Sequence, residues 1–159
     1  MANNMTEQEI KKLAEQVVEK LNGGMTLDLA NTLIEKVKQK AEEMGVNAVI
    51  AVSNAAAQPV SVQSMNGAYI ASYDIAVNKA YTVVALKMPT TTLKELAAPG
   101  GSLYGIQFTN QGKIVIFGGG VPLYDKWGNI IGGLGVSGGS EVQDTDLAEF
   151  GGKAFASLL

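Results

Sequence analysis

The segment from Gly118 to Gly139 constrains the fold of this chain more than any other, because nine of its 22 residues are glycine. It ends in Gly133-Leu-Gly135-Val-Ser-Gly138, which matches the phosphate-binding pattern G-x-G-x-x-G. A dinucleotide-binding unit also needs a second parallel strand after the helix, with an acidic residue about 20 positions further on. Only 21 residues follow Gly138, which leaves no room for that strand. We therefore predict that these glycines do not hold a nucleotide.

Close packing is the other explanation for so much bare backbone. Glycines at 132, 133 and 135 weaken a strand unless a helix, a neighbouring subunit or a flat ligand packs directly on it. Residues 125–129 carry Gly128 and have the length of a hairpin loop. Gly138 and Gly139 precede a helix start, where free backbone N–H groups can bind an anion. The carboxylates of the first turn complement the helix dipole and oppose an anion, and they are Glu141, Asp144 and Asp146.

Hydrophobic spacing, caps and turn signals predict an α+β chain. The expected helices occupy residues 6–22, 26–44, 73–88, 90–97 and 140–158, with N-caps at Thr6, Thr26, Ser72 and Ser140. The expected strands occupy residues 46–52, 59–65, 113–117, 121–124 and 129–137. Neighbouring strands with tight connections favour an antiparallel sheet of about five strands that is covered by helices.

Composition removes several classes of function. The chain has no histidine and no cysteine, which excludes Ser-His-Asp and Cys-His catalysis, disulfides and the usual zinc sites. A net charge of −3 and a pI near 4.9 argue against a nucleic-acid surface. No long apolar window occurs, and the start MANNMTEQEIKK lacks the pattern of a secretory signal. We expect a cytoplasmic protein without a nucleic-acid or membrane partner and without a metal site of its own.

Two long segments resemble one known family. They are SMNGAYIASYDIAVNKAYTVVALKMPTTTL, at residues 64–93, and GGGVPLYDKWGNIIGGLGVSGGSEVQDTDLAEFGGKA, at residues 118–154. Their spaced motifs are similar to those of the GlcG/HbpS family, which includes the C-terminal domain of PduO-type proteins. The resemblance covers residues 26–159. It implies a profilin-like α-β sandwich with an antiparallel sheet, assembly into a homo-oligomer that is often an octamer, and binding of heme or another tetrapyrrole.

The resemblance also implies a set of cofactor-binding residues, which are Met65, Asn66, Lys79, Gly119, Gly120, Pro122 and Gly138. This chain departs from the family pattern there, since Ser64-Met65-Asn66 stands where the family has Arg-Met-Asp. Heme-binding relatives can use a histidine ligand, which this chain lacks, so iron would need Tyr, Met or Lys. We therefore expect any heme to bind weakly and without a histidine-ligated spectrum.

Lys79 and Asp74 fall on the expected apolar helix and allow two interpretations. In the functional interpretation, they contact a carboxylate of a ligand. In the structural interpretation, which we favour, they form an ion pair or the lysine stem extends to solvent. Four aromatic side chains fit either stacking on a flat ring or a place in the core or an interface, and these are Tyr69, Tyr73, Tyr81 and Trp127.

Residues 6–21 precede the family-like region and resemble the encapsulation peptides of bacterial microcompartment cargo. Those peptides are terminal amphipathic helices that dock on shell proteins through an apolar stripe, which here is Ile10, Leu13, Val17 and Leu21. Gly23-Gly24 sets this helix apart, so we expect a helix and linker at 1–24 and a GlcG/HbpS-like domain at 25–159. The alternative is a helix that packs on its own domain or on a sister subunit, because any amphipathic helix shows this spacing.

Three hypotheses for function follow from the sequence. The first is an oligomeric, non-enzymatic binding or accessory protein for a tetrapyrrole-type cofactor, carried as microcompartment cargo. The second is a cofactor-handling enzyme of corrinoid or flavin metabolism that uses the Asp74/Lys79 region and the Gly118–Gly120 loop. The third is a structural cargo protein without a ligand.

Overall fold

The computed structural model describes residues 5–159, apart from the side chains of residues 19–22. Five α-helices and four strands occur in this described part of the chain. They follow one another as α1 (Glu7–Asn22), α2 (Leu27–Glu43), β1 (Val49–Asn54), β2 (Pro59–Ser64), α3 (Ile70–Ala85), α4 (Thr90–Ala97), β3 (Gly120–Tyr124), β4 (Ile130–Ser137) and α5 (Glu141–Ala156). Two short 3₁₀ turns, Ile106–Phe108 and Asn110–Gly112, lie between α4 and β3.

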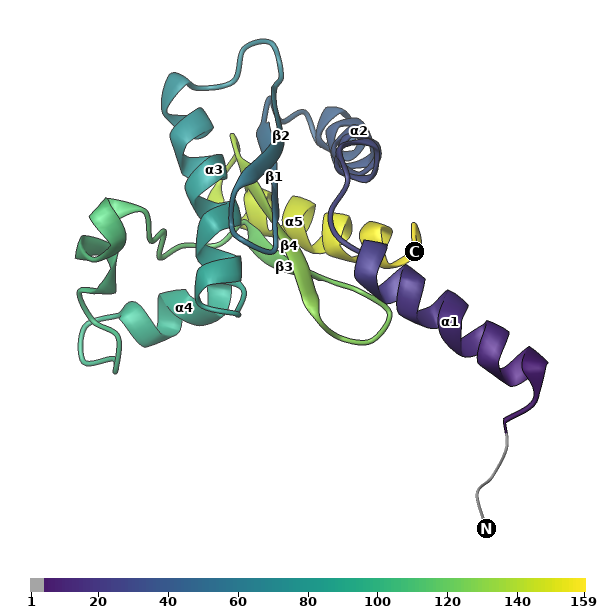
Figure 1. Ribbon diagram of the computed structural model, residues 1–159. Helices are drawn as coiled ribbons and strands as arrows, with labels where there is room; N and C mark the ends of the chain where they lie inside the picture. Colours follow the sequence, from purple (N-terminus) through teal and green to yellow (C-terminus); the bar gives the residue numbers. More distant parts are fainter. Residues whose placement is uncertain (1–4) are drawn as a thin grey trace.

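The strands form one antiparallel sheet in the order β2-β1-β4-β3. β1 and β2 make one hairpin, β3 and β4 make the other, and β4 pairs with β1 at the centre. α2 and α5 lie on one face of the sheet, and α3 lies on the other (Figure 1). The main core lies between the sheet and the α2–α5 pair, and its large members include Leu33, Ile34, Ile50, Leu134, Leu147 and Phe155. The expected α+β class is therefore confirmed.

Residues 113–117 do not form the expected fifth strand. Val115 N–H donates to Thr82 Oγ1 of α3 at 3.0 Å, and that hydroxyl donates its own hydrogen to Asn78 O of α3 at 2.7 Å. A side chain on α3 thus satisfies a backbone N–H that a strand ladder would otherwise pair. This segment packs against α3 and connects to β3, which begins at Gly120.

α3 begins earlier than expected, at Ile70, with Tyr69 at the N-cap position. Ser72 is therefore not the cap; it is buried in the first turn and accepts a hydrogen bond from Ser137 Oγ of β4 at 3.1 Å. Only one side of α3 faces the sheet, so Ile70 is 98% exposed and Tyr73 is 53% exposed.

The glycines of β4 allow α3 to lie directly on the sheet. A Cβ at Gly135 would collide with the carbonyl oxygen of Ala76, and a Cβ at Gly133 would collide with that of Ala80. Both carbonyls belong to α3. Of the three packing explanations for these glycines, close approach of a helix is the one found.

α1 extends away from the rest of the molecule (Figure 1). Its N-terminus carries the expected capping box, in which Thr6 N–H donates to Glu9 Oε2 at 2.7 Å and Glu9 N–H donates to Thr6 Oγ1 at 3.3 Å. Every side chain from Glu7 to Val18 is exposed. Within residues 5–159, no helix combines the length and hydropathy that crossing a bilayer requires.

The apolar stripe of α1 therefore has no partner within the described chain. Ile10, Leu13 and Val17 are each about half exposed, at 49–55%. The side chain of Leu21, the fourth residue expected in the stripe, lies outside the described residues.

Candidate functional site

Asp144, in the first turn of α5, binds the glycine loop that precedes this helix. Its Oδ1 accepts hydrogen bonds from the backbone N–H groups of Gly138 at 3.1 Å and Gly139 at 2.9 Å. Asp144 is only 4% exposed. The backbone donors that could have bound an anion are thus already bound by a carboxylate of the chain itself.

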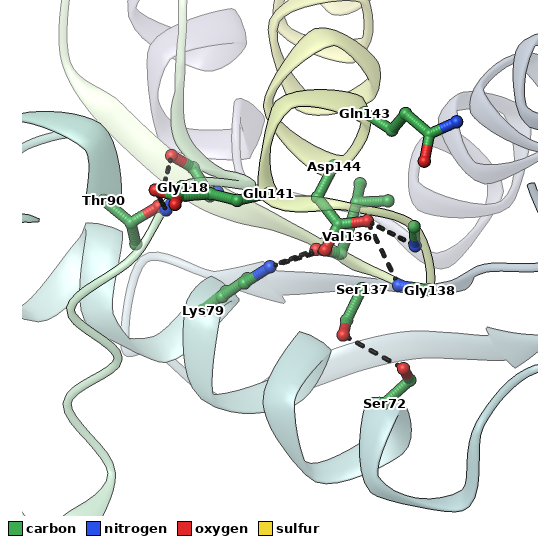
Figure 2. Close-up of polar contacts among 12 residues, drawn as sticks. Ser72, Lys79, Thr90, Gly118, Val136, Ser137, Gly138, Glu141, Gln143 and Asp144 are labelled. Atoms are coloured by element: carbon green, nitrogen blue, oxygen red, sulfur yellow. Dashed lines mark hydrogen bonds and ion pairs between the residues drawn. The ribbon is translucent and has the colours of Figure 1, made fainter.

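Lys79 of α3 supplies the opposite charge to Asp144 (Figure 2). Its Nζ donates to Asp144 Oδ2 at 3.0 Å and to Val136 O of β4 at 2.7 Å, and no part of Lys79 is exposed. Burial lowers the pKa of Lys79 below its usual 10.5, while the charge of Asp144 and its hydrogen bond oppose that shift. Lys79 is therefore part of an internal ion pair, which joins α3 to β4 and α5.

Gly119 lies against the same lysine. Its φ is +111°, and a Cβ at this position would lie 2.6 Å from Lys79 Nζ, so the position requires glycine. The neighbouring Gly120 N–H donates to Thr90 Oγ1 of α4 at 2.9 Å. The glycine loop at 118–120 thus covers the buried ammonium and is held in place from α4.

Glu141, at the start of α5, holds the other end of this loop. It accepts a hydrogen bond from Gly118 N–H at 3.0 Å and pairs with Lys94 Nζ of α4 at 2.7 Å. The hydrogen bond from Lys94 lowers the pKa of Glu141 most, and the one from Gly118 adds to the effect.

An open hollow of about 320 Å³ lies beside this network. We call it the aromatic groove, because Tyr69 and Phe117 line it with exposed fractions of 72% and 39%. Phe117 also has its ring centroid 4.9 Å from Lys79 Nζ. Glu141 and Asp144 supply the charged groups of the lining.

A second hollow, of about 370 Å³, adjoins the groove and shares Tyr69, Gly138 and Gly139 with it. We call it the polar pocket, because the side chains of Asn47, Ser140 and Gln143 line it and no charged side chain does. The groove and the pocket meet at the Gly138–Gly139 loop. Their sizes are in the range of small-molecule sites, roughly 300–1,000 Å³.

The structure divides the residues that the family resemblance implied. Lys79, Gly119, Gly120 and Gly138 gather around the ion pair. Met65 and Asn66 line a different hollow of about 350 Å³, which Asn47 also lines. Pro122 is buried in the edge strand β3.

The remaining candidates lie apart from one another. Asp74 is exposed and does not pair with Lys79. The hydroxyl of Tyr81 donates to Asn110 Oδ1 at 3.1 Å. Trp127 lines a small hollow at the base of α1, together with Gly23 and Gly24.

Sequence reasoning missed Phe117 and assigned Asp144 and Glu141 only to the helix dipole. A signal for Asp144 was present, because Gln143-Asp144 lies inside the second segment that resembles the family. No local pattern marks Phe117 as a groove residue.

These features define an α+β protein with one helix on one face of a four-stranded sheet, an internal lysine–carboxylate pair and an adjoining open groove. A family model described as "Haem degrading protein HbpS-like" matches residues 25–152, and the chain belongs to this HbpS-like family.

Individual relatives agree with this assignment. The chain is 37% identical over 148 residues to a corrinoid adenosyltransferase PduO of Citrobacter freundii; the match covers 88% of this chain and 44% of that enzyme, so the chain spans under half of its length. The crystal structure of Klebsiella pneumoniae protein ORFY has a TM-score of 0.81 and 38% identity, covering 85% of this chain and 92% of that one. A PduOC–heme complex has a TM-score of 0.78 and 35% identity, covering 82% and 94%.

The residues of the groove fit a flat ring, but they do not fit heme with an imidazole-bound iron. Exposed aromatic faces at Tyr69 and Phe117 suit stacking. The chain has no imidazole or thiolate, and the sulfur of Met65 lies at another hollow and accepts a hydrogen bond from Ala48 N–H at 3.3 Å. The charged groups of the groove, Glu141 and Asp144, have the same sign as heme propionates.

Proposed function

We propose that this chain is a binding or accessory protein that holds a flat, tetrapyrrole-type ligand in the aromatic groove. The observation that carries the proposal is the open hollow of about 320 Å³ lined by Tyr69 and Phe117, the former 72% exposed. An aromatic side chain so exposed beside a concave surface offers a stacking face to a ring. The heme complex of the PduOC relative, at 35% identity, supports the choice of ligand class.

Binding is a better proposal than catalysis, because the charged side chains beside the groove are already bound to other groups of the protein. Lys79 and Asp144 form a buried pair, and Glu141 accepts from Lys94 and from Gly118 N–H. A general acid or base must reach its substrate with a hydrogen bond. These groups hold the loops in place instead.

The protein acts, in this proposal, as a homo-oligomer carried as bacterial microcompartment cargo. Support comes from α1, a capped amphipathic helix whose apolar stripe at Ile10, Leu13 and Val17 is half exposed. Such a stripe on a projecting terminal helix suits docking into a groove of a shell protein.

The ligand proposal is tested by titrating the purified full chain with hemin, hydroxocobalamin and riboflavin while recording visible absorbance. We expect saturable binding of a tetrapyrrole, and we expect Tyr69→Ala to weaken it by about 2- to 10-fold, the worth of one aromatic contact. Tyr104→Ala is the matched control, because Tyr104 is 67% exposed and lies outside the groove lining.

Two results would contradict the proposal. One is the absence of saturable tetrapyrrole binding, or an equal loss of affinity in the two tyrosine variants. The other is a steady disappearance of the ligand's absorbance with turnover, which would contradict a binding role without catalysis.

A further inference from the structure

We infer that the groove selects a flat ring with uncharged amide, ester or other carbonyl groups at its edge, rather than a ring that carries free carboxylates there. The inference rests on the proposed function and names the chemical class of its ligand. It follows from the charges that line the two hollows and from the hydrogen-bond donors that remain free there.

The charged groups of the combined surface are all negative. Glu141 and Asp144 line the aromatic groove, and no charged side chain lines the polar pocket. A ligand carboxylate placed in the aromatic groove would lie near these two carboxylates, whose negative charges Lys79 and Lys94 partly offset. Like charges at short range in a partly desolvated site repel each other.

The lysines nearest to these carboxylates are already paired with them. Lys79 is fully buried and bonds Asp144 and Val136 O, and Lys94 bonds Glu141 at 2.7 Å. Neither lysine lines the groove or the polar pocket. A propionate would therefore have to compete with Asp144 or Glu141 for its partner.

Two wider features point the same way. The chain contains no arginine, the residue whose planar fork suits bidentate carboxylate binding. The hollow lined by Met65 and Asn66 shares Asn47 with the polar pocket. Its lysine, Lys38, lies there with Glu42 and pairs with Glu35 at 2.9 Å. No surplus positive charge is thus available along this surface.

Neutral donors do remain available in the polar pocket. Gln143 uses its Oε1 to accept from Ser140 N–H at 2.9 Å, and Ser140 Oγ accepts from Gln143 N–H at 3.3 Å. These bonds leave the amide NH₂ of Gln143 and the hydroxyl hydrogen of Ser140 free to donate. Figure 2 shows the amide nitrogen of Gln143 pointing away from Asp144. Together with the amide of Asn47, they suit carbonyl groups at the edge of a ring that stacks in the adjoining groove.

The test compares two ligands with the same ring and different charge: hemin, which has two free propionates, and hemin dimethyl ester, which has none. The full chain is titrated with each in the same dilute non-ionic detergent. We expect the ester to bind about 2- to 5-fold more tightly, because the repulsion comes from two carboxylates that are each partly offset by a lysine. Added salt should narrow the difference, because it screens the repulsion of the diacid alone.

A charge variant locates the effect. Glu141→Gln keeps a carbonyl oxygen for Gly118 N–H and removes the negative charge, so we expect hemin to bind several-fold more tightly and the ester to bind unchanged. Glu149→Gln is the matched control, because Glu149 is an exposed residue of α5 outside both hollows. Melting temperatures of the variants check that both remain folded.

The outcomes separate this inference from the proposed function. If hemin binds as tightly as its ester, or if Glu141→Gln and Glu149→Gln behave alike, the inference of an uncharged ring edge is wrong while ring binding stands. If neither ligand binds, the proposed function fails and the inference fails with it.

Discussion

At the scale of single residues, Asp144 makes more hydrogen bonds than Lys79 does. We therefore expect the two side chains to differ in how much stability the protein loses when each is removed. Asp144 accepts from Lys79, Gly138 and Gly139, whereas Lys79 donates to Asp144 and to Val136 O. We expect Asp144→Ala to lower the free energy of unfolding by about 3–5 kcal/mol, because it leaves an unpaired buried ammonium. We expect Lys79→Met to cost about 1–2 kcal/mol, because the carboxylate keeps its two N–H donors. Urea denaturation measures both, and equal losses would contradict the prediction.

The pH dependence of these variants gives a second readout. Burial lowers the pKa of Lys79, so between that lowered pKa and 10.5 the unfolded chain binds more protons than the folded one. Stability from this group therefore rises with pH in that interval. Without Asp144 the pKa of Lys79 falls further, which widens the interval below 10.5, so Asp144→Ala should regain stability relative to the unsubstituted chain as the pH rises through that interval. A gap that stays constant over this range would count against the assignment.

The candidate site was only partly predictable from such residues. Lys79 and the loop glycines stand in motifs that the chain shares with a family, so their importance could be inferred. The pairing of Lys79 with Asp144 joins positions 65 apart in sequence, and no periodicity or spacing rule reports such a contact. The groove likewise depends on Tyr69 and Phe117, which are far apart in sequence, lining the same hollow.

At the scale of elements, local chemistry decided which predictions succeeded. The caps at Thr6, Thr26 and Ser140 are confirmed, because each hydroxyl accepts from a backbone N–H three residues on. The strand expected at 113–117 is absent, and Thr82, 33 positions before Val115, accepts the hydrogen bond of the Val115 N–H. Propensity alone does not reveal a competitor that distant.

α1 is the element whose role is most open to test. Its described side chains bury nothing, so deleting residues 1–22 should shift the melting temperature of the remaining chain by less than about 2 °C. Fusing residues 1–22 to a fluorescent reporter should bring it to a microcompartment shell. Ile10→Glu should abolish that localisation, because a carboxylate on the docking stripe must lose its water at a cost of several kcal/mol.

Lys11→Ala, on the polar face of α1, is the control and should leave localisation unchanged. A structural role for α1 predicts the opposite pattern. In that case the truncated chain would melt at a clearly lower temperature, and the reporter would stay diffuse.

At the scale of the whole molecule, the chain exposes more surface than a monomer of its mass needs to. Its accessible surface is 9120 Å² at 16.6 kDa, against about 7,600 Å² for a typical monomer. The projecting α1 accounts for part of the excess. The outer side of α3 contributes exposed apolar groups, with Ile70 at 98% and Tyr73 at 53%. A stable interface buries about 800 Å² per partner, and it would have to include these exposed apolar groups.

We therefore expect the full chain to form a homo-oligomer through the outer side of α3. Light scattering at about 10 μM should give a mass of at least two chains, since burial of exposed apolar side chains such as Ile70 and Tyr73 favours association. Ile70→Asp should shift the population towards the monomer, because the carboxylate would have to be desolvated in the interface. Thr92→Asp, at an exposed position of α4, is the matched control and should leave the mass unchanged. Ile70 lies outside the aromatic groove, so ligand affinity can be measured separately on the same variant. A single monomeric species for the unsubstituted chain would overturn the prediction. Equal effects of Ile70→Asp and Thr92→Asp would show that the interface does not lie on α3.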